Sequence, residues 1–348
     1  MIKAGILGST GYAGSELTRL LMNHPKVKIE FLDSRSYEGD TYSNIYPNLK
    51  GLVDIKCSSI DLANPVELDN IDVLFCALPH GLSQKAVQEG VKRGIKVIDL
   101  SADFRISNPS VYEDWYNVEH KALHELKTAV YGLTEIHREN IKTTQLVANP
   151  GCYPTSILLA VYPLLKEKLI LTEMIIADSK SGVSGAGRNP IDATIYAQCN
   201  ESVKAYSLGT HRHTPEIEQE LSLMAGGQVL IQFTPHLIPM TRGILSTIYV
   251  MNSNNLKEKD LVEIYHNYYK NENFIRVLTG GQLPQTKAVV GSNLCDIGFK
   301  VDERTGKIIL VSAIDNLIKG ASGQAVQNMN VMFGIEEMIG LQQMPLWP

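Results

Sequence analysis

The first 165 residues alternate two kinds of apolar pattern, and this alternation restricts the fold more than any other feature of the sequence. Short β-branched runs such as residues 2–8 (IKAGILG) and 27–34 (VKIEFLDS) are followed by longer amphipathic runs such as residues 14–24 (GSELTRLLMNH). The same alternation continues through residues 71–79, 86–94, 96–103, 146–149 and 154–165. Apolar strands separated by helices are typical of a parallel sheet covered on both faces. We therefore predict an α/β domain with a doubly wound parallel sheet.

The pattern changes after Leu165, where longer strand-like runs replace the alternation. These runs are residues 172–182, 229–239, 243–252 and 294–315, and the last contains a hairpin turn at 303–306. They predict a second, α+β domain with a mixed or antiparallel sheet. Residues 320–340 have a helical pattern that we expect to pack back on the first domain. We thus assign 1–150 and 318–348 to the first domain and 151–317 to the second.

Composition excludes several classes of protein. A formal charge of -5, spread without long runs of one sign, argues against nucleic acid as the main partner. No segment offers about 18 uninterrupted apolar residues, so we expect no membrane partner and a cytoplasmic location. The five cysteines have no CxxC spacing, which indicates reduced thiols rather than disulfides or a zinc site.

Three glycines at the start of the chain indicate a dinucleotide site. Gly8, Gly11 and Gly14 directly follow the first strand and open the next helix. Glycine lets the backbone approach a pyrophosphate closely, and the free amides of a helix start face its negative charge. The spacing GxxGxxG departs from GxGxxG, and an ordinary tight turn is the alternative. The position at a strand-to-helix turn predicts a Rossmann-type nucleotide-binding domain.

The end of the second strand bears on which dinucleotide binds. Ser34, Arg35 and Ser36 would accept a 2′-phosphate, whereas Asp33 would bind a ribose 2′-hydroxyl and repel that phosphate. We predict NADP(H), on condition that Asp33 points elsewhere; a plain polar turn is the alternative.

Cys152 is the cysteine whose setting suggests chemistry. In residues 146–156 (LVANPGCYPTS), Pro150 and Gly151 turn the chain out of a strand, and a helix follows. A sulfur at a helix N-terminus is favoured as thiolate, and the carboxyl end of a parallel strand faces the ligand crevice. We predict that Cys152 is a nucleophile, whereas Cys76 and the other cysteines are expected to be small buried hydrophobes.

Two histidines are candidates for the acid/base partner of this thiol. His211 and His213 stand just before Thr214 and Pro215, which open a predicted helix. If the segment is extended, their rings point apart, so that one transfers protons and the other binds or orients. A metal pair is the alternative, but no third ligand is signalled nearby and we predict no metal. Most of the others lie in polar segments and are expected at the surface: His24, His120, His124, His137 and His266.

A glycine-rich loop and two arginines complete the candidates drawn from the residues. Residues 181–188 (SGVSGAGR) follow a strand and offer backbone donors to an oxyanion or cofactor, although a flexible hairpin explains them equally well. Arg105 and Arg242 follow apolar strands and either reach an anionic substrate or cap the surface.

Seven segments together resemble the N-acetyl-gamma-glutamyl-phosphate reductases, a family similar in architecture to aspartate-semialdehyde and glyceraldehyde-3-phosphate dehydrogenases. The segments are GSTGYAG, LSADFR, NPGCYPT, SGVSGAGR, HRHTPEI, PMTRGI and KGASGQAVQNMN, and they run from the first strand to the last helix. The resemblance implies NADPH-dependent reduction of N-acetyl-L-glutamyl 5-phosphate to N-acetyl-L-glutamate 5-semialdehyde and phosphate, through a cysteine thioester, in arginine biosynthesis. It also implies a cytoplasmic homo-oligomer, a tetramer.

The resemblance also implies roles for individual residues. The nucleophile falls on Cys152 and the acid/base group on His211. The implied cofactor residues are Gly8, Ser9, Thr10, Gly11, Tyr12, Ala13, Ser34, Arg35, Ser181, Gly182, Ser184, Gly185 and Asn316. The implied substrate residues are Arg105, Asn149, Tyr206, His213, Glu216 and Arg242.

Three other functions are compatible with parts of the sequence. A hydrolytic cysteine enzyme would use Cys152 and His211 but leaves the glycine loop unexplained. A dinucleotide sensor would need the first domain but no activated thiol. A related reductase would act on an aspartyl phosphate or an aminoadipyl-type substrate.

Overall fold

The computed structural model describes residues 1–347 and divides the chain into two compact units. The first comprises residues 1–150 and 321–342, and the second comprises residues 151–320 and 343–347. The division differs at two places from the expected assignment of 318–348 to the first domain. Residues 318–320 stay with the second unit, and so does the C-terminal end, where the Leu346 amide donates to the Val290 carbonyl at 2.9 Å.

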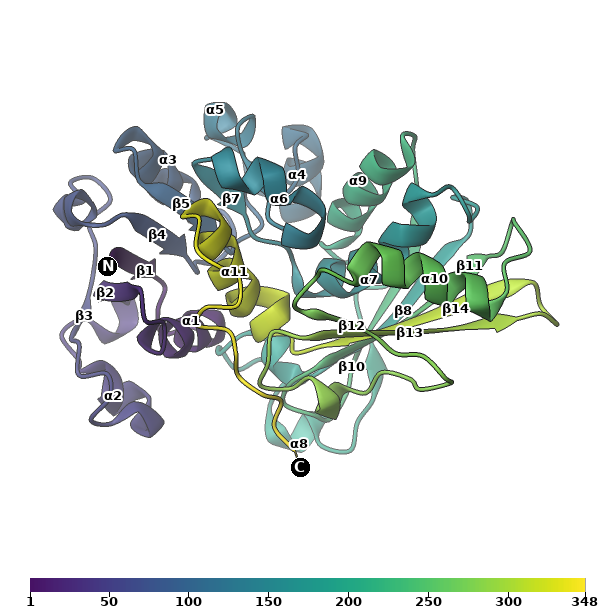
Figure 1. The fold of residues 1–348 in the computed structure, drawn as a ribbon. Helices are drawn as coiled ribbons and strands as arrows, with labels where there is room; N and C mark the ends of the chain where they lie inside the picture. The colour runs from purple at the N-terminus through teal and green to yellow at the C-terminus, as the bar shows by residue number, and fades with distance from the viewer. Residues whose placement is uncertain (348) are drawn as a thin grey trace. The chain divides into compact units, whose positions relative to one another are not determined.

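The first unit contains a sheet of seven strands whose paired neighbours all run parallel (Figure 1). Its order is β3-β2-β1-β4-β5-β7-β6, so the chain leaves β1 toward one edge and later returns to β4 on the other side of β1. In such sheets ligands bind at the carboxyl ends of the strands that flank the reversal, which are β1 and β4 here. The strands are β1 (Ile2–Leu7), β2 (Val27–Asp33), β3 (Cys57–Ser58), β4 (Val73–Cys76), β5 (Lys96–Asp99), β6 (Val130–Tyr131) and β7 (Leu146–Ala148).

Helices cover both faces of this sheet, as its continuously buried strands require. On one face α11 packs between α1 and α6, and on the other α3 packs with α5 over β4 and β5 (Figure 1). The predicted return of the C-terminal helix to the first domain is thereby confirmed for α11. The helices are α1 (Tyr12–Met22), α2 (Tyr42–Ile45), α3 (Gln84–Lys92), α4 (Pro109–Tyr116), α5 (Leu123–Leu126), α6 (Thr134–Thr143) and α11 (Gly323–Met332).

The second unit contains a mixed sheet of seven strands, in the order β12-β13-β14-β11-β8-β10-β9. β8 runs parallel to β10 and antiparallel to β11, and β13 and β14 form the predicted hairpin, with Asp302 opposite Lys307. The strands are β8 (Ile175–Ser181), β9 (Lys204–Ala205), β10 (Ile231–Leu237), β11 (Ile244–Met251), β12 (Ile275–Val277), β13 (Cys295–Asp302) and β14 (Lys307–Ile314). The predicted fold class is confirmed in both units.

Helices α7, α9 and α10 pack on one face of the mixed sheet. Along β8 and β11 every second residue is buried and the residues between are half-buried, so the two faces of these strands differ in cover. The helices of this unit are α7 (Cys152–Lys166), α8 (Tyr196–Cys199), α9 (Thr214–Ala225) and α10 (Glu258–Tyr269).

Candidate active site

The glycine loop of the first unit joins β1 to α1, as predicted. Gly8 has a φ of +72°, and a Cβ there would lie 2.4 Å from the Ala77 carbonyl oxygen. A Cβ on Gly14 would lie 2.3 Å from the Gly8 carbonyl oxygen. A Cβ on Gly11, in contrast, meets no protein atom closer than 3.6 Å. The fold itself requires Gly8 and Gly14, whereas Gly11 leaves its backbone open to a ligand, which fits a bound pyrophosphate.

Two tyrosines that the sequence did not single out fix the shape of this loop. The Tyr42 hydroxyl donates to the Ser9 carbonyl at 2.8 Å, and the Tyr46 hydroxyl donates to the Thr10 carbonyl at 2.9 Å. No local signal marks them, because they lie more than thirty residues away, in and directly after the short helix α2. At the helix side, Ser322 donates to the Ala13 carbonyl at 2.7 Å, so the loop is held along its length.

The orientation of Asp33 bears on whether the end of β2 suits a 2′-phosphate or a ribose 2′-hydroxyl. Its carboxylate is buried and accepts the Gly8 and Ile60 amides at 3.3 and 2.8 Å. Burial, the largest influence, raises its pKa against the effect of these two amides. Arg35, in the next turn, is exposed, and the Ser34 hydroxyl lies 2.7 Å from that of Thr10. Asp33 therefore turns inward and leaves Arg35 at the surface, an arrangement that fits a 2′-phosphate.

Arg105 and Asn149 also lie in the first unit, and protein groups engage both side chains. Arg105 donates to the carbonyls of Asn149 and Leu100, both at 2.7 Å. The Asn149 side chain is fully buried, donates to the Ala321 carbonyl and accepts from Asn328, both at 3.0 Å. These contacts hold the turn after β7, and substrate contact by either residue stays a prediction.

The LSADFR segment contains a buried hydrogen-bond network of carboxylates and hydroxyls, which local sequence patterns did not predict. The Ser101 hydroxyl donates to Asp99 at 2.7 Å and lies 2.6 Å from that of Ser83, which donates to Asp103 at 2.8 Å. Burial, followed by the Asp103 carboxylate, raises the pKa of Asp99 well above its usual range. The network fixes the residues that precede Arg105.

In the second unit, Cys152 is the first residue of α7, which begins two residues nearer the strand than the predicted helix start. It is partly exposed, and none of the five cysteines forms a disulfide. Cys57, Cys76 and Cys295 are buried as expected, whereas the expectation was wrong for Cys199, which is partly exposed. A Cβ on Gly320 would lie 2.7 Å from the Cys152 Cβ, so glycine is needed beside the thiol. The Gly151 amide donates to Glu216 at 2.7 Å. The sulfur thus lies at a helix N-terminus, where the dipole favours a thiolate.

His211 stands in an aromatic surround beside this helix. Its ring lies 5.5, 5.4 and 5.2 Å from the rings of Tyr153, Tyr206 and Phe233, measured between centroids. Burial, followed by the charge of Arg212, lowers the pKa of His211 to about 4. The His213 amide donates to His211 Nδ1 at 3.1 Å, so a neutral ring carries its proton on Nε2.

The two imidazoles do not point apart, contrary to the extended geometry considered for the sequence. Residues 211–214 form a turn, with the Thr214 amide on the His211 carbonyl at 2.9 Å, and the ring centroids of His211 and His213 are 4.9 Å apart. Among residues 1–347, no group of three His, Cys, Asp or Glu side chains is placed to hold a metal ion. Two histidines expected at the surface, His24 and His120, are buried.

Tyr206 lies near both the Cys152 thiol and the His211 ring. Its hydroxyl lies 3.1 Å from that of Tyr153. Burial raises the pKa of Tyr206 to about 12, and negative charge on Cys152 adds to the rise against the hydrogen bond with Tyr153. The structure therefore brings Cys152, Tyr206 and His211 into one neighbourhood of the second unit.

The predicted cofactor loop follows β8 and is built around Asn316. The Asn316 side chain donates to the Ser184 hydroxyl at 2.9 Å and accepts the Gly243 amide at 2.7 Å. Ser181, Ser184 and Asn316 are buried, and Gly185 is exposed. A Cβ on Gly182 would lie 2.7 Å from the Thr241 carbonyl oxygen, which accounts for that glycine. Arg242, next in sequence, lies 3.5 Å from the Asp315 carboxylate.

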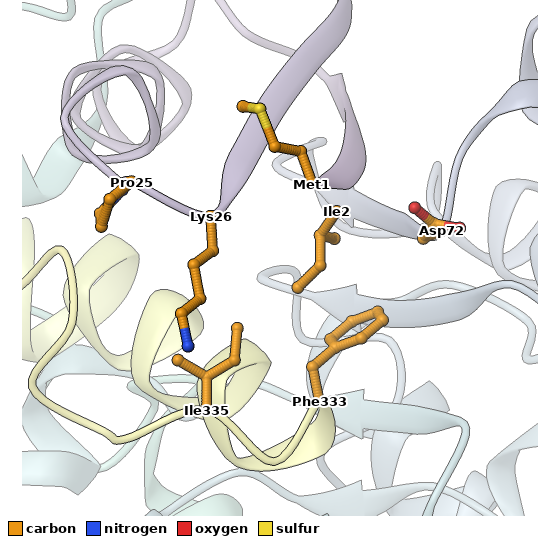
Figure 2. A pocket seen from close by; sticks show the side chains of 7 residues that line it. All are labelled: Met1, Ile2, Pro25, Lys26, Asp72, Phe333 and Ile335. Carbon is orange, nitrogen blue, oxygen red and sulfur yellow. The ribbon is translucent and has the colours of Figure 1, made fainter.

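An open surface pocket of about 460 Å³ lies elsewhere in the first unit (Figure 2). Met1, Lys26, Asp72 and Phe333 are among its lining residues, and Ile2 places it at the amino end of β1. The glycine loop lies at the opposite, carboxyl end of that strand, so this pocket is separate from the candidate nucleotide site.

Comparison with known proteins identifies the family. The family model described as "Semialdehyde dehydrogenase, NAD binding domain" matches residues 3–144, and "Semialdehyde dehydrogenase, dimerisation domain" matches residues 152–316. The N-acetyl-gamma-glutamyl-phosphate reductase of Alkaliphilus metalliredigens is 67% identical over 100% of both chains. The chain belongs to the N-acetyl-gamma-glutamyl-phosphate reductase family. A reductase of the same name from Desulforudis audaxviator is 53% identical, also over 100% of both chains.

Solved structures agree with this family in fold. Aspartate semialdehyde dehydrogenase II of Vibrio cholerae, in a complex with ASA, has a TM-score of 0.71 at 19% identity over 96% of this chain and 98% of that chain. The Candida albicans aspartate semialdehyde dehydrogenase with NADP has a TM-score of 0.70 at 16% identity over 96% and 98%. None of the helices described within residues 1–347 has the length and apolar character needed to cross a bilayer.

Proposed function

We propose that the chain reduces N-acetyl-L-glutamyl 5-phosphate with NADPH to N-acetyl-L-glutamate 5-semialdehyde and phosphate, in arginine biosynthesis. The observation that carries the proposal is the 67% identity to a reductase of that name over the full length of both chains. The reaction class, an oxidoreductase that uses a nicotinamide cofactor, follows from the family. The site residues described above supply a mechanism.

Cys152 forms the covalent intermediate. A carboxylate resists reduction because its charge and resonance protect the carbon, so the substrate arrives as an acyl phosphate. The Cys152 thiolate attacks the acyl carbon to give a tetrahedral oxyanion, which collapses to a thioester as phosphate leaves with the bonding electron pair. Amides at a helix start point away from the helix, and those of the first turn of α7 other than Pro154, which has no N–H, are proposed to serve the oxyanion. Arg242 is the candidate within this unit for the departing phosphate charge, and Arg105 is the candidate in the first unit.

His211 is the proposed acid/base group at the oxygen of the reduced intermediate. As a neutral ring with a hydrogen on Nε2, it donates a hydrogen bond to the thiohemiacetal oxygen, which reduction leaves as an alkoxide on the carbon attached to Cys152. This oxygen then re-forms the carbonyl as the C–S bond breaks with its electron pair on sulfur, which releases the aldehyde and regenerates the thiolate. Tyr206 and His213, in ring contact with His211, are assigned to substrate binding.

Residues of both units are proposed to hold the cofactor. The loop of residues 8–13 suits the pyrophosphate, Ser34 and Arg35 suit the 2′-phosphate, and Ser181, Gly182, Ser184, Gly185 and Asn316 suit the nicotinamide end. When bound, NADPH supplies the hydride that reduces the thioester. The buried carboxylate of Asp33 and the exposed Arg35 support NADPH over NADH.

The two units are proposed to have separate roles. The first, residues 1–150 with the returning helix α11, is the nucleotide-binding domain, and residues 151–317 form the catalytic and oligomerisation domain. The matched description of a dimerisation domain at residues 152–316 supports this division. The half-buried residues that alternate along β8 and β11 offer a sheet face for a second copy. We propose a homotetramer in the cytoplasm, where free cysteines persist.

The reverse reaction tests this function. NADP⁺ reduction should require both phosphate and N-acetyl-glutamate 5-semialdehyde, followed as the absorbance of the reduced nicotinamide. Faster turnover of aspartate semialdehyde or an aminoadipate-type semialdehyde would reassign the substrate. Phosphate-independent release of an acid without nicotinamide reduction would instead support a hydrolytic cysteine enzyme. Nucleotide binding without turnover would support a sensor.

A further inference from the structure

Glu216 is a buried carboxylate on α9 that accepts a hydrogen bond from the start of α7. It is the third residue of α9 and has no exposed surface. Its Oε1 accepts the Gly151 amide at 2.7 Å across 65 positions of the chain. Gly151 directly precedes Cys152, so this bond ends one residue from the nucleophile.

The start of α9 explains why Glu216 is available for this contact. A glutamate at the third position of a helix commonly accepts the amide of its own N-cap residue. Here the N-cap is His213, and its amide donates instead to His211 Nδ1 at 3.1 Å. The imidazole thereby takes over the usual capping role of the glutamate. One short segment thus sets the tautomer of His211 and turns Glu216 toward Gly151.

Gly151 directly precedes Cys152 and sets the path by which the chain enters α7. It is the N-cap of α7, with φ −68° and ψ 154°. Its carbonyl accepts the Thr155 amide and hydroxyl at 3.0 and 2.9 Å, and its amide is held by Glu216. Further along α7 the Ser156 hydroxyl lies 2.9 and 2.6 Å from those of Ser246 and Ser312 in the sheet. Without the bond to Glu216, the amide side of Gly151 would lose its anchor, and the first turn of α7, which carries Cys152, would shift.

We propose that Glu216 is a positioning residue that holds the Gly151 turn and so aims the Cys152 sulfur, rather than a group that contacts the substrate. The proposal rests on the proposed role of Cys152 as nucleophile. We attribute the effect to the hydrogen bond rather than to the negative charge, because the donor to Oε1 next to Cys152 is a neutral backbone amide. A misplacement of about 1 Å at a reacting group can cost about 100-fold in rate.

Two substitutions of similar volume separate the hydrogen bond from side-chain size. Glu216→Gln keeps an oxygen that accepts an amide, and Glu216→Met has none of comparable strength. Glu218 provides the matched control, since its Oε1 accepts the Ile231 amide at 3.1 Å from the same helix, away from Cys152. The full-length variants are compared by kcat, KM for the acyl phosphate, NADPH affinity and melting temperature.

We expect Glu216→Met to lower kcat about 100-fold with KM and NADPH affinity changed less than about threefold, and Glu216→Gln to recover most of the rate. Glu218→Met, at a half-buried position, should leave kcat unchanged while it removes the bond to Ile231. A raised KM with normal kcat would make Glu216 a substrate contact and overturn the proposal. Equal rates for the Gln and Met variants would also overturn it, because the hydrogen bond would then carry nothing.

If Glu216→Met does not fold, Glu216→Asp, one methylene too short to reach Gly151, replaces it with the same expectations. If Cys152→Ser keeps its turnover, the proposed function fails whatever Glu216 does. If Cys152→Ser is inactive and Glu216→Met turns over normally, the positioning role alone fails.

Discussion

The lowered pKa of His211 predicts how the stability of the protein depends on pH. In the folded state the ring titrates at about 4, and its ordinary value is 6.5. As the pH falls below 6.5, the unfolded chain binds a proton at this position before the folded protein does. Protonation therefore favours unfolding, and the loss of stability levels off below about pH 4.

The size of the effect follows from this interval. A difference of about 2.5 pH units at about 1.4 kcal/mol per unit gives a limit of about 3 kcal/mol, of which about 2 kcal/mol has accrued at pH 5. His211→Asn removes the titrating ring, while its amide oxygen can still accept the His213 amide. The free energy of unfolding should thus fall by about 2 kcal/mol less in the variant than in the unchanged protein between about pH 7.5 and pH 5.

Urea unfolding at the two pH values, with equal ionic strength and no nucleotide, measures this difference. Other groups that titrate in this range, including the buried Asp99, are common to both proteins and cancel in the comparison. His266→Asn is the matched control, because His266 is exposed on α10. An identical pH dependence for the unchanged protein and His211→Asn, or NMR titration of the His211 ring near 6.5, would refute the reasoning.

Four further predictions concern the site. Cys152→Ser should abolish turnover and leave NADPH affinity nearly intact, as measured by single-turnover kinetics and fluorescence titration; a normal rate would remove the covalent step. Arg35→Asp should shift the preference toward NADH, measured as the ratio of kcat/KM for the two cofactors, and unchanged NADPH kinetics would place 2′-phosphate recognition elsewhere. Gly8→Ala should cost about 1–3 kcal/mol of stability, because of its positive φ and the nearby Ala77 carbonyl. Gly11→Ala should have the same free energy of unfolding as the unchanged protein but bind NADPH more weakly. Unchanged affinity would contradict a pyrophosphate at Gly11.

Local patterns carried the prediction of the fold a long way. The period of apolar residues is set by the geometry of each strand or helix, so the alternation in the first half was sufficient for a parallel sheet. The longer runs after Leu165 were sufficient for the mixed one. The hairpin at 303–306 and the helix start at Thr214 depend on neighbouring residues in the same way, and the structure has both.

Patterns could not give contacts between distant parts of the chain. The burial of His24 and His120 was missed because polar neighbours in sequence say nothing of what packs on a residue from elsewhere. The C-terminal end was assigned to the wrong unit for a related reason. Its placement depends on contacts such as that of Leu346 with Val290, which no periodicity reports.

The sequence by itself determined which residues stand at the ends of strands and the starts of helices: the glycines after β1, Cys152 at the start of α7, and the two histidines before α9. Tertiary structure alone decided what surrounds them. It turned Asp33 inward and buried His211 among Tyr153, Tyr206 and Phe233, and it joined Glu216 to Gly151. The physical reason is that a helix start or a turn is specified by a few adjacent residues, whereas burial and hydrogen-bond partners arise only when segments far apart in the chain pack together.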